Sequence, residues 1–175
     1  LDYTFPVGGG GTGSGSQSLL KITDNEELDF YLKRKQDMII QEYIPGDDCE
    51  YTAGLFSDGN TIHTVTFKRT LAPGGFSQQV ELVPDREVMD FPRRVAEVLD
   101  FKGSVNLQFR KTPDRCIPFE INPRFSSTVY FRHLFGFRDV QWSLDMLTGK
   151  EVRYTPVNKK AVGVRKFGEV IFTLE

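Results

Sequence analysis

Cysteine and histidine are scarce in this chain, which has 175 residues and only two of each. The two cysteines, Cys49 and Cys116, are too few for a disulfide framework, so the sequence predicts a reducing, cytoplasmic setting. Neither a secretory signal nor an apolar run of membrane-spanning length is present in it. The net charge is only −2, which excludes a strong basic field. We therefore expect neither a nucleic-acid partner nor a membrane partner.

Aromatic and aliphatic residues are abundant instead. The chain is 39% hydrophobic and has 15 phenylalanines, which is enough to bury a core and argues against disorder. Its length suits one ordinary domain or one large piece of a multi-lobed protein. Because no methionine precedes Leu1, we expect a piece of a longer protein.

Hydrophobic periodicity and turn residues predict a mixed succession of strands and helices. Strands are predicted at residues 3–7, 17–22, 38–44, 50–56, 61–69, 77–83, 104–110, 115–121, 161–164 and 169–173. Helices are predicted at residues 23–35, 90–100, 128–137 and 140–148. This order indicates an α+β fold, with helices packed on an antiparallel sheet.

Polar and apolar side chains alternate in the stretch 119–122. As a strand, it puts Glu120 and Asn122 on one face and Phe119 and Ile121 on the other. Pro123 then turns the chain and Arg124 follows, where its guanidinium suits a phosphate. A surface salt bridge is the alternative role for this arginine.

The preceding strand, 104–110, should pair with the stretch 119–122 in a hairpin. A turn near Asp114 puts Gln108 opposite Glu120 and Asn106 opposite Asn122, with Cβ atoms about 5 Å apart. These polar side chains of the paired strands, called the strip below, are one carboxylate and three amides. They offer only oxygen ligands, which suit a hard cation such as Mg²⁺. A solvated face of a half-buried hairpin shows the same alternation, so spacing alone leaves both interpretations open.

Two further features suit phosphate groups. Lys68 and Arg69 are adjacent cations near a glycine-containing loop, and with the strip they would form a phosphoryl-transfer set if they converge. The run Gly8–Ser16 is rich in glycine and serine, so it is either a flexible linker or a loop that cradles phosphate. Composition favours the linker, and the Gly-Lys-Ser/Thr end of a Walker loop is absent from the run.

Four motifs occur together in a recognisable order. They are Gly13-Ser14-Gly15-Ser16, then Gln41-Glu42-Tyr43-Ile44-Pro45-Gly46 with Glu50-Tyr51-Thr52, then Asn106-Leu107-Gln108, and finally Glu120-Ile121-Asn122-Pro123-Arg124-Phe125-Ser126. With them the chain resembles the ATP-grasp superfamily over about residues 9–150. It is most similar to the ATP-binding domain of the carbamoyl-phosphate synthase large chain and to carboxylate–amine ligases.

The resemblance implies that ATP is held between two subdomains. Residues 1–45 would form a small strand–helix–strand lid with the Gly-rich loop, and residues 46–175 the larger antiparallel sheet with the metal and phosphate site. Gly13, Ser14, Gly15 and Ser16 would close over the β- and γ-phosphates. Gln41, Glu42, Tyr43 and Ile44 would contact adenine, although core packing alone explains Tyr43 and Ile44.

The remaining roles also follow from the resemblance. Glu50 would bind the ribose hydroxyls, and Arg69 with Lys68 would face the phosphates. Mg²⁺, with Mn²⁺ as an alternative, would be held by Gln108, Glu120 and Asn122. Arg124 would steady the transferred phosphoryl group.

The implied activity is that of an ATP-dependent ligase. Such an enzyme activates a small carboxylate as an acyl phosphate, which an amine or a similar nucleophile then attacks. Two features depart from the family pattern: no lysine occurs before Lys21, and the usual N-terminal α/β lobe is missing. They support the alternative of a non-catalytic or partner-dependent nucleotide-binding fragment. Without the resemblance, a plain α+β interaction domain would explain the pattern.

Overall fold

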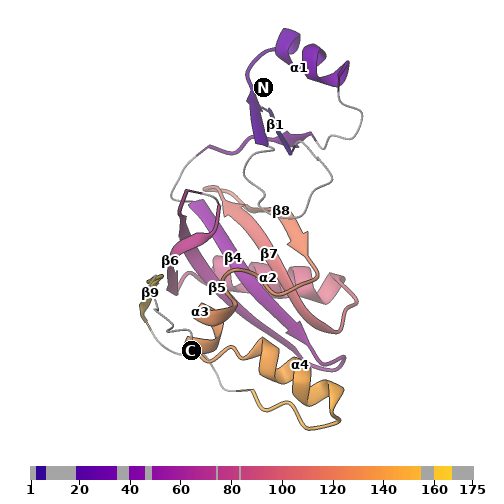
Figure 1. Cartoon of the computed structure of the whole chain (residues 1–175), viewed down its shortest axis with the longest axis vertical. Coiled ribbons are helices and arrows are strands. Elements are labelled where there is room, and N and C mark those ends of the chain that lie inside the picture. Colours follow the sequence, from indigo (N-terminus) through magenta and orange to yellow (C-terminus); the bar gives the residue numbers. More distant parts are fainter. Residues whose placement is uncertain are drawn as a thin grey trace, which may run out of the picture.

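The computed structural model describes residues 3–6, 19–34, 40–45, 49–73, 75–82, 84–154 and 160–166. A small sheet stands apart from a larger one (Figure 1). It consists of β1 (Tyr3–Pro6), β2 (Leu19–Ile22) and β3 (Gln41–Glu42), in the order β2-β1-β3. The helix α1 (Asn25–Leu32) accompanies it, so the predicted strand–helix–strand arrangement is present.

The larger sheet has six antiparallel strands in the order β8-β7-β4-β5-β6-β9. Its strands are β4 (Glu50–Ser57), β5 (Ile62–Leu71), β6 (Ser77–Leu82), β7 (Gly103–Lys111), β8 (Cys116–Asn122) and β9 (Val162–Val164). The helices α2 (Arg86–Val98), α3 (Val129–Leu134) and α4 (Asp139–Leu147) flank it. The predicted α+β fold, an antiparallel sheet flanked by helices, is confirmed.

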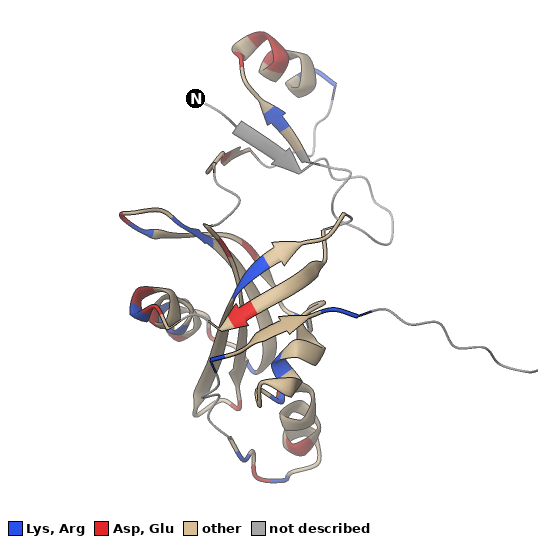
Figure 2. Ribbon diagram, turned by 90° about the vertical axis from the view of Figure 1, so that its left-hand side faces the viewer, with Lys and Arg blue, Asp and Glu red and all other residues tan. Residues whose placement is uncertain are grey.

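Helices cover both faces of the large sheet, α2 on one side and α3 and α4 on the other (Figure 2). On the first face Tyr51, Leu55 and Leu107 belong to the same apolar core as Val88 and Ala96 of α2. On the second face an aromatic core joins sheet and helix residues: Phe56, Val65, Phe67, Val80, Phe131, Phe135, Phe137 and Trp142. The central strand β4 is buried along its whole length because it lies between these two cores.

The helix α2 begins earlier than the predicted residue 90. Asp85 is its N-cap, where the side-chain carboxylate accepts a hydrogen bond from the backbone N–H of Val88 at 3.2 Å. Pro92, which the predicted start at residue 90 would put in the first turn, therefore lies inside the helix, where it is buried. The predicted start was wrong because it allowed the proline only in the first turn and overlooked the aspartate cap.

Some expectations cannot be compared with the structure. The Gly-rich loop with Gly13, Ser14, Gly15 and Ser16 lies outside the described residues, as does the predicted strand 169–173. The predicted strand 38–44 is described from residue 40 onward, and there only Gln41–Glu42 is a strand. In the part of the chain that the structure describes, no helix combines the length and apolar character needed to cross a membrane.

Gly54 in the middle of β4 packs closely against Arg132 of α3 and against Phe137, which lies between α3 and α4. A Cβ added there would lie 2.7 Å from Nε of Arg132 and 2.9 Å from the ring of Phe137. We expect Gly54→Ala to lower the free energy of unfolding by about 1–3 kcal/mol, because the packed neighbours must move. Urea denaturation measures this. Unchanged stability would show that Arg132 and Phe137 yield without cost.

Candidate functional site

The two strands of the predicted oxygen-ligand strip pair in the expected register. In the ladder between β7 and β8, Asn106 is the Cα partner of Asn122, and Gln108 is the partner of Glu120. The predicted pairing is confirmed. It brings the side chains of Gln108, Glu120 and Asn122 to the same face of the sheet, because paired residues in antiparallel strands point the same way.

Beyond the strip the register shifts between Gln108 and Phe109, so that Phe109 pairs with Pro118 and Phe119 has no Cα partner. The carbonyl oxygen of Phe119 instead accepts a hydrogen bond from Nε2 of Gln41 in β3 at 3.2 Å. Ile117 consequently lies opposite Arg110 on the polar face, whereas strict alternation with Phe119 and Ile121 predicts the apolar face, and that prediction was wrong. The cause is Pro118, which cannot donate to a ladder and favours an edge-strand irregularity.

The strip is held by side-chain hydrogen bonds. Nδ2 of Asn122 donates to Oε1 of Glu120 at 2.6 Å, and Oε1 of Gln108 accepts from Nη2 of Arg69. Glu120 is exposed, while Gln108 and Asn122 are half-buried. Within the described residues, no three His, Cys, Asp or Glu side chains gather as a metal site. A cation here would therefore bind one carboxylate together with amide oxygens, which fits a hard ion such as Mg²⁺.

Asn106 does not offer its oxygen to the strip. Its side chain is 1% exposed, and Oδ1 accepts hydrogen bonds from Oγ1 of Thr52 at 3.1 Å and from Nη2 of Arg132. Because both bonds come from the interior, this oxygen is engaged there. The buried Asn106 is therefore excluded from the three amides expected from the alternation, while Gln108, whose Oε1 accepts from Arg69, is half-buried and stays beside Glu120 and Asn122.

Arg69 reaches the strip from the neighbouring part of the sheet. Its Nε donates to Oε1 of Glu50 at 2.9 Å, and its Nη2 bonds both Glu50 and Gln108. Lys68 does not accompany it. The ladder pairs Lys68 with Tyr51, which belongs to the core beneath α2, so alternation directs Lys68 to the opposite face. The structure brings together Arg69, Glu50 and the strip, but leaves Lys68 outside this group.

Glu50 lies between two arginines. Besides Arg69, Nη2 of Arg110 donates to Oε2 of Glu50 at 2.9 Å, and the glutamate is only 9% exposed. Two guanidinium groups around one carboxylate leave a net positive charge beside the strip, as a phosphate site requires. The sequence interpretation missed Arg110, although it lies two residues after Gln108 and the strand period puts it on the same face.

The segment 40–45 comprises β3 of the small sheet and the residues on either side of it, and it contacts the hairpin of β7 and β8 at several points. The carbonyl oxygen of Ile44 accepts a hydrogen bond from Nη1 of Arg110. Glu42 makes an exposed ion pair with Arg115 at 3.5 Å. Tyr43 and Ile44 are half-buried, and Nζ of Lys21 lies 4.3 Å from the centroid of the Tyr43 ring. This segment therefore approaches the same group of arginines as the strip.

Arg124 follows the strip and is exposed. Its Nη1 donates to the backbone carbonyl of Phe125 at 3.0 Å. This local bond to the next residue leaves most of the guanidinium donors accessible. Arg124 is thus placed at the end of the strip, separate from the pair that Arg69 and Arg110 form around Glu50.

A buried ion pair between Arg132 and Asp139, which was not predicted, lies beside Asn106 on the helix-covered side of the sheet. Arg132 is fully buried, and its Nη1 lies 3.1 Å from Oδ2 of Asp139, while Nη2 donates to the carbonyl oxygen of Ala53 at 3.1 Å. The pKa of Arg132 is lowered from its ordinary value because burial outweighs the opposing effect of Asp139. Oγ of Ser104 also donates to Oδ2 of Asp139 at 2.7 Å. The pair joins α3 and α4 to β7.

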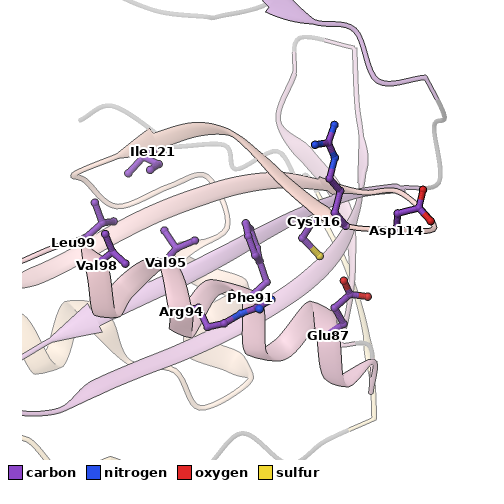
Figure 3. Close-up of a pocket in the computed structure, with 10 residues that line it drawn as sticks. Glu87, Phe91, Arg94, Val95, Val98, Leu99, Asp114, Cys116 and Ile121 are labelled. Atoms are coloured by element: carbon purple, nitrogen blue, oxygen red, sulfur yellow. The ribbon is translucent and has the colours of Figure 1, made fainter.

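The other face of the hairpin has a different character. A hollow of about 650 Å³ lies between α2 and β8 (Figure 3). Apolar residues dominate its lining, among them Phe91, Val95, Leu99 and Ile121. Ile121 lies between Glu120 and Asn122 in the strand and points to the opposite face. This hollow is therefore separate from the polar side of the strip.

The chain is similar to known proteins in sequence and in fold. The family model described as "ATP-grasp in the biosynthetic pathway with Ter operon" matches residues 34–170. The carbamoyl phosphate synthase large chain of Clostridium beijerinckii is 26% identical over 156 residues, which cover 79% of this chain and 14% of that protein.

Two solved structures show the same fold. N5-carboxyaminoimidazole ribonucleotide synthetase from Thermus thermophilus has a TM-score of 0.68 at 14% identity, covering 88% of this chain and 43% of that one. The biotin carboxylase–β,γ-ATP complex from Campylobacter jejuni has a TM-score of 0.66 at 12% identity, covering 87% and 38%. The chain thus spans less than half the length of these two proteins and about a seventh of the carbamoyl phosphate synthase large chain. With a family model matching most of its length, the chain belongs to the ATP-grasp family.

Proposed function

We propose that this chain is the ATP-binding part of an ATP- and Mg²⁺-dependent ligase. The enzyme activates a small carboxylate as an acyl phosphate, which an amine or similar nucleophile then attacks. The observation that carries the proposal is the convergence of Gln108, Glu120 and Asn122 with the Arg69–Glu50 pair on one sheet face. Oxygen ligands beside a cationic pair match the needs of a metal–triphosphate complex.

Each part of the nucleotide has a matching group. The segment Gln41, Glu42, Tyr43 and Ile44 would face adenine, and Glu50 the ribose hydroxyls. Gln108, Glu120 and Asn122 would hold Mg²⁺, which would neutralise charge on the phosphate oxygens. Arg69 would face the phosphates, where its bond to Glu50 keeps the guanidinium oriented. Mn²⁺ would fit the same oxygen donors. Gly13, Ser14, Gly15 and Ser16 would close over the phosphates.

The reaction has two displacement steps. A carboxylate oxygen of the substrate attacks the γ-phosphorus, the bond to the bridging oxygen breaks, and ADP leaves. The amine nitrogen then attacks the acyl carbon, phosphate leaves, and the amine loses a proton. Residues of this chain act by positioning and by charge: Arg124 would contact the transferred phosphoryl group, and Arg69 would orient the nucleotide phosphates.

Calorimetric titration with ATP, with and without Mg²⁺, tests the proposal. We expect heat from ATP binding that strengthens when Mg²⁺ is present. Release of ADP across a panel of carboxylates and amines then separates a ligase from a fragment that only binds nucleotide or needs a partner lobe. The second possibility has support in the small share of its relatives that this chain spans. Absence of binding to the intact chain would reject the nucleotide site itself.

Arg124→Ala should affect turnover more than ATP affinity. The side chain lies beyond the metal strip, is exposed and donates locally to the carbonyl of Phe125, so we place it at the transferred group. We expect kcat for ADP release to fall about 100-fold, with the Kd for ATP changed less than about threefold. Arg93→Ala, on the exposed side of α2, is the matched control. Equal losses in kcat and affinity would count against this role.

A further inference from the structure

A continuous series of side-chain hydrogen bonds connects the segment 40–45 with the strip. Arg110 donates to the carbonyl oxygen of Ile44 and to Oε2 of Glu50. Oε1 of Glu50 accepts from Arg69, whose Nη2 also donates to Gln108. The two carboxylate oxygens of Glu50 are thus each held by a different arginine. Every bond in the series is charge-assisted, which makes it stronger than a bond between neutral groups.

Arg110, at the start of this series, has a fixed backbone and a side chain with several donors. It is a residue of β7, where it is the Cα partner of Glu50 in β4, and its side chain is 24% exposed. The backbone of β7 is fixed on both sides, by β4 and by β8. A planar guanidinium presents its donors in a rigid fork, so one arginine can hold two acceptors in a defined geometry.

Among the described residues, strand pairing holds the first part of the segment that Arg110 contacts. β3 pairs with β1 at Gln41 and Glu42, and the carbonyl oxygen of Pro45 accepts a hydrogen bond from Sγ of Cys49 at 3.7 Å. Residues 43–45, which follow β3, are not part of a strand. A side chain that anchors the carbonyl of Ile44 therefore restrains a stretch that the small sheet does not hold.

We propose that Arg110 is a positioning residue for the nucleotide. It holds the segment 41–44 at a fixed place relative to Glu50, so that the groups for adenine and for ribose keep one separation. This inference rests on the proposed function, because it takes these two groups as the nucleotide contacts. Arg110 acts through Ile44 and Glu50 and does not itself touch the nucleotide.

The test compares Arg110→Met and Arg110→Lys with the unchanged chain, and Arg93→Met on α2 is the matched control. Methionine keeps the length of the side chain but has no donors, and lysine keeps the charge without the fork. Dissociation constants are measured for ATP, ADP and AMP, with and without Mg²⁺. Hydrogen exchange of peptides covering residues 40–45 is followed in the absence of nucleotide.

We expect Arg110→Met to raise the dissociation constants of ATP, ADP and AMP alike, by about tenfold, because adenine and ribose are common to all three. The dissociation constants of Arg110→Lys should lie between those of Arg110→Met and those of the unchanged chain. The strengthening of ATP binding by Mg²⁺ should stay within about twofold of the unchanged chain. Amides of residues 40–45 should exchange about tenfold faster in Arg110→Met, while the Arg93→Met control shows neither effect.

Unchanged dissociation constants in a folded Arg110→Met chain, or a loss confined to the Mg²⁺ effect, would overturn the inference. So would unchanged hydrogen exchange. If Arg110→Met does not fold, Arg110→Lys decides by the same criteria, because it retains the positive charge beside Glu50. Failure of the proposed function is recognised separately, since the unchanged chain would then bind no nucleotide. Hydrogen exchange would still decide whether Arg110 anchors residues 40–45.

Discussion

Asp139→Ala is expected to lower the free energy of unfolding by about 3–5 kcal/mol, because it leaves a charged guanidinium buried without its carboxylate. Arg132 is fully buried, and Oδ2 of Asp139 lies 3.1 Å from its Nη1. Its Nε already lacks a hydrogen-bond partner among the described residues. The same substitution removes the acceptor of the Ser104 hydroxyl. Equilibrium denaturation in urea measures the change.

A double substitution separates the charge effect from simple loss of packing. Arg132→Met with Asp139→Leu removes both charges and keeps much of the volume, so we expect it to be more stable than Asp139→Ala alone. The exposed pair Arg93–Glu97 on α2 is the matched control. Glu97→Ala should cost under about 0.5 kcal/mol. A loss below about 1 kcal/mol in Asp139→Ala would contradict the assigned role.

The buried pair also has a consequence for the site. Arg132 donates to Asn106 and to the carbonyl of Ala53, and both acceptors belong to the strands on which the strip is built. Asn106 is the Cα partner of Asn122, so the position of Asn106 in β7 helps to fix the position of Asn122 in β8. The buried charge of Arg132 thus helps to position Asn122, a predicted metal ligand.

The pairing of the strip was predictable because it depends on local rules. Side chains alternate with a period of two, and a short turn near Asp114 fixes which residues face each other. Gln108 and Glu120 accordingly meet as expected. The fold class followed from the same kind of evidence, since the order of strands and helices is a local property. The motif order then pointed to the family.

What could not be predicted depends on contacts between distant residues or on local irregularities. The bulge at Phe119, next to Pro118, reverses the faces beyond it, so alternation alone places Ile117 on the wrong face. The grouping of Glu50 with Arg69 and Arg110 joins three strands whose order is not written in any one of them. The adjacent pair Lys68 and Arg69 suggested joint action, but neighbours in a strand point to opposite faces.

Glu120→Gln is expected to weaken Mg²⁺-dependent ATP binding at least about 100-fold, because it removes the only carboxylate of the strip while keeping its size. Folding should change little, by about 0.5 kcal/mol or less, because Glu120 is exposed and a glutamine oxygen still accepts from Asn122. Calorimetric titration at several Mg²⁺ concentrations measures the first effect, and thermal denaturation the second.

Glu81→Gln is the matched control for this substitution. Glu81 is an exposed glutamate of the same sheet, in β6, and its Cα partner is Lys68. It loses the same charge, so a general electrostatic effect on an anionic ligand would appear in both variants. A large loss of thermal stability in Glu120→Gln would instead assign Glu120 a structural role. Affinity for ATP that loses its response to Mg²⁺ only in Glu120→Gln would locate the cation at the strip.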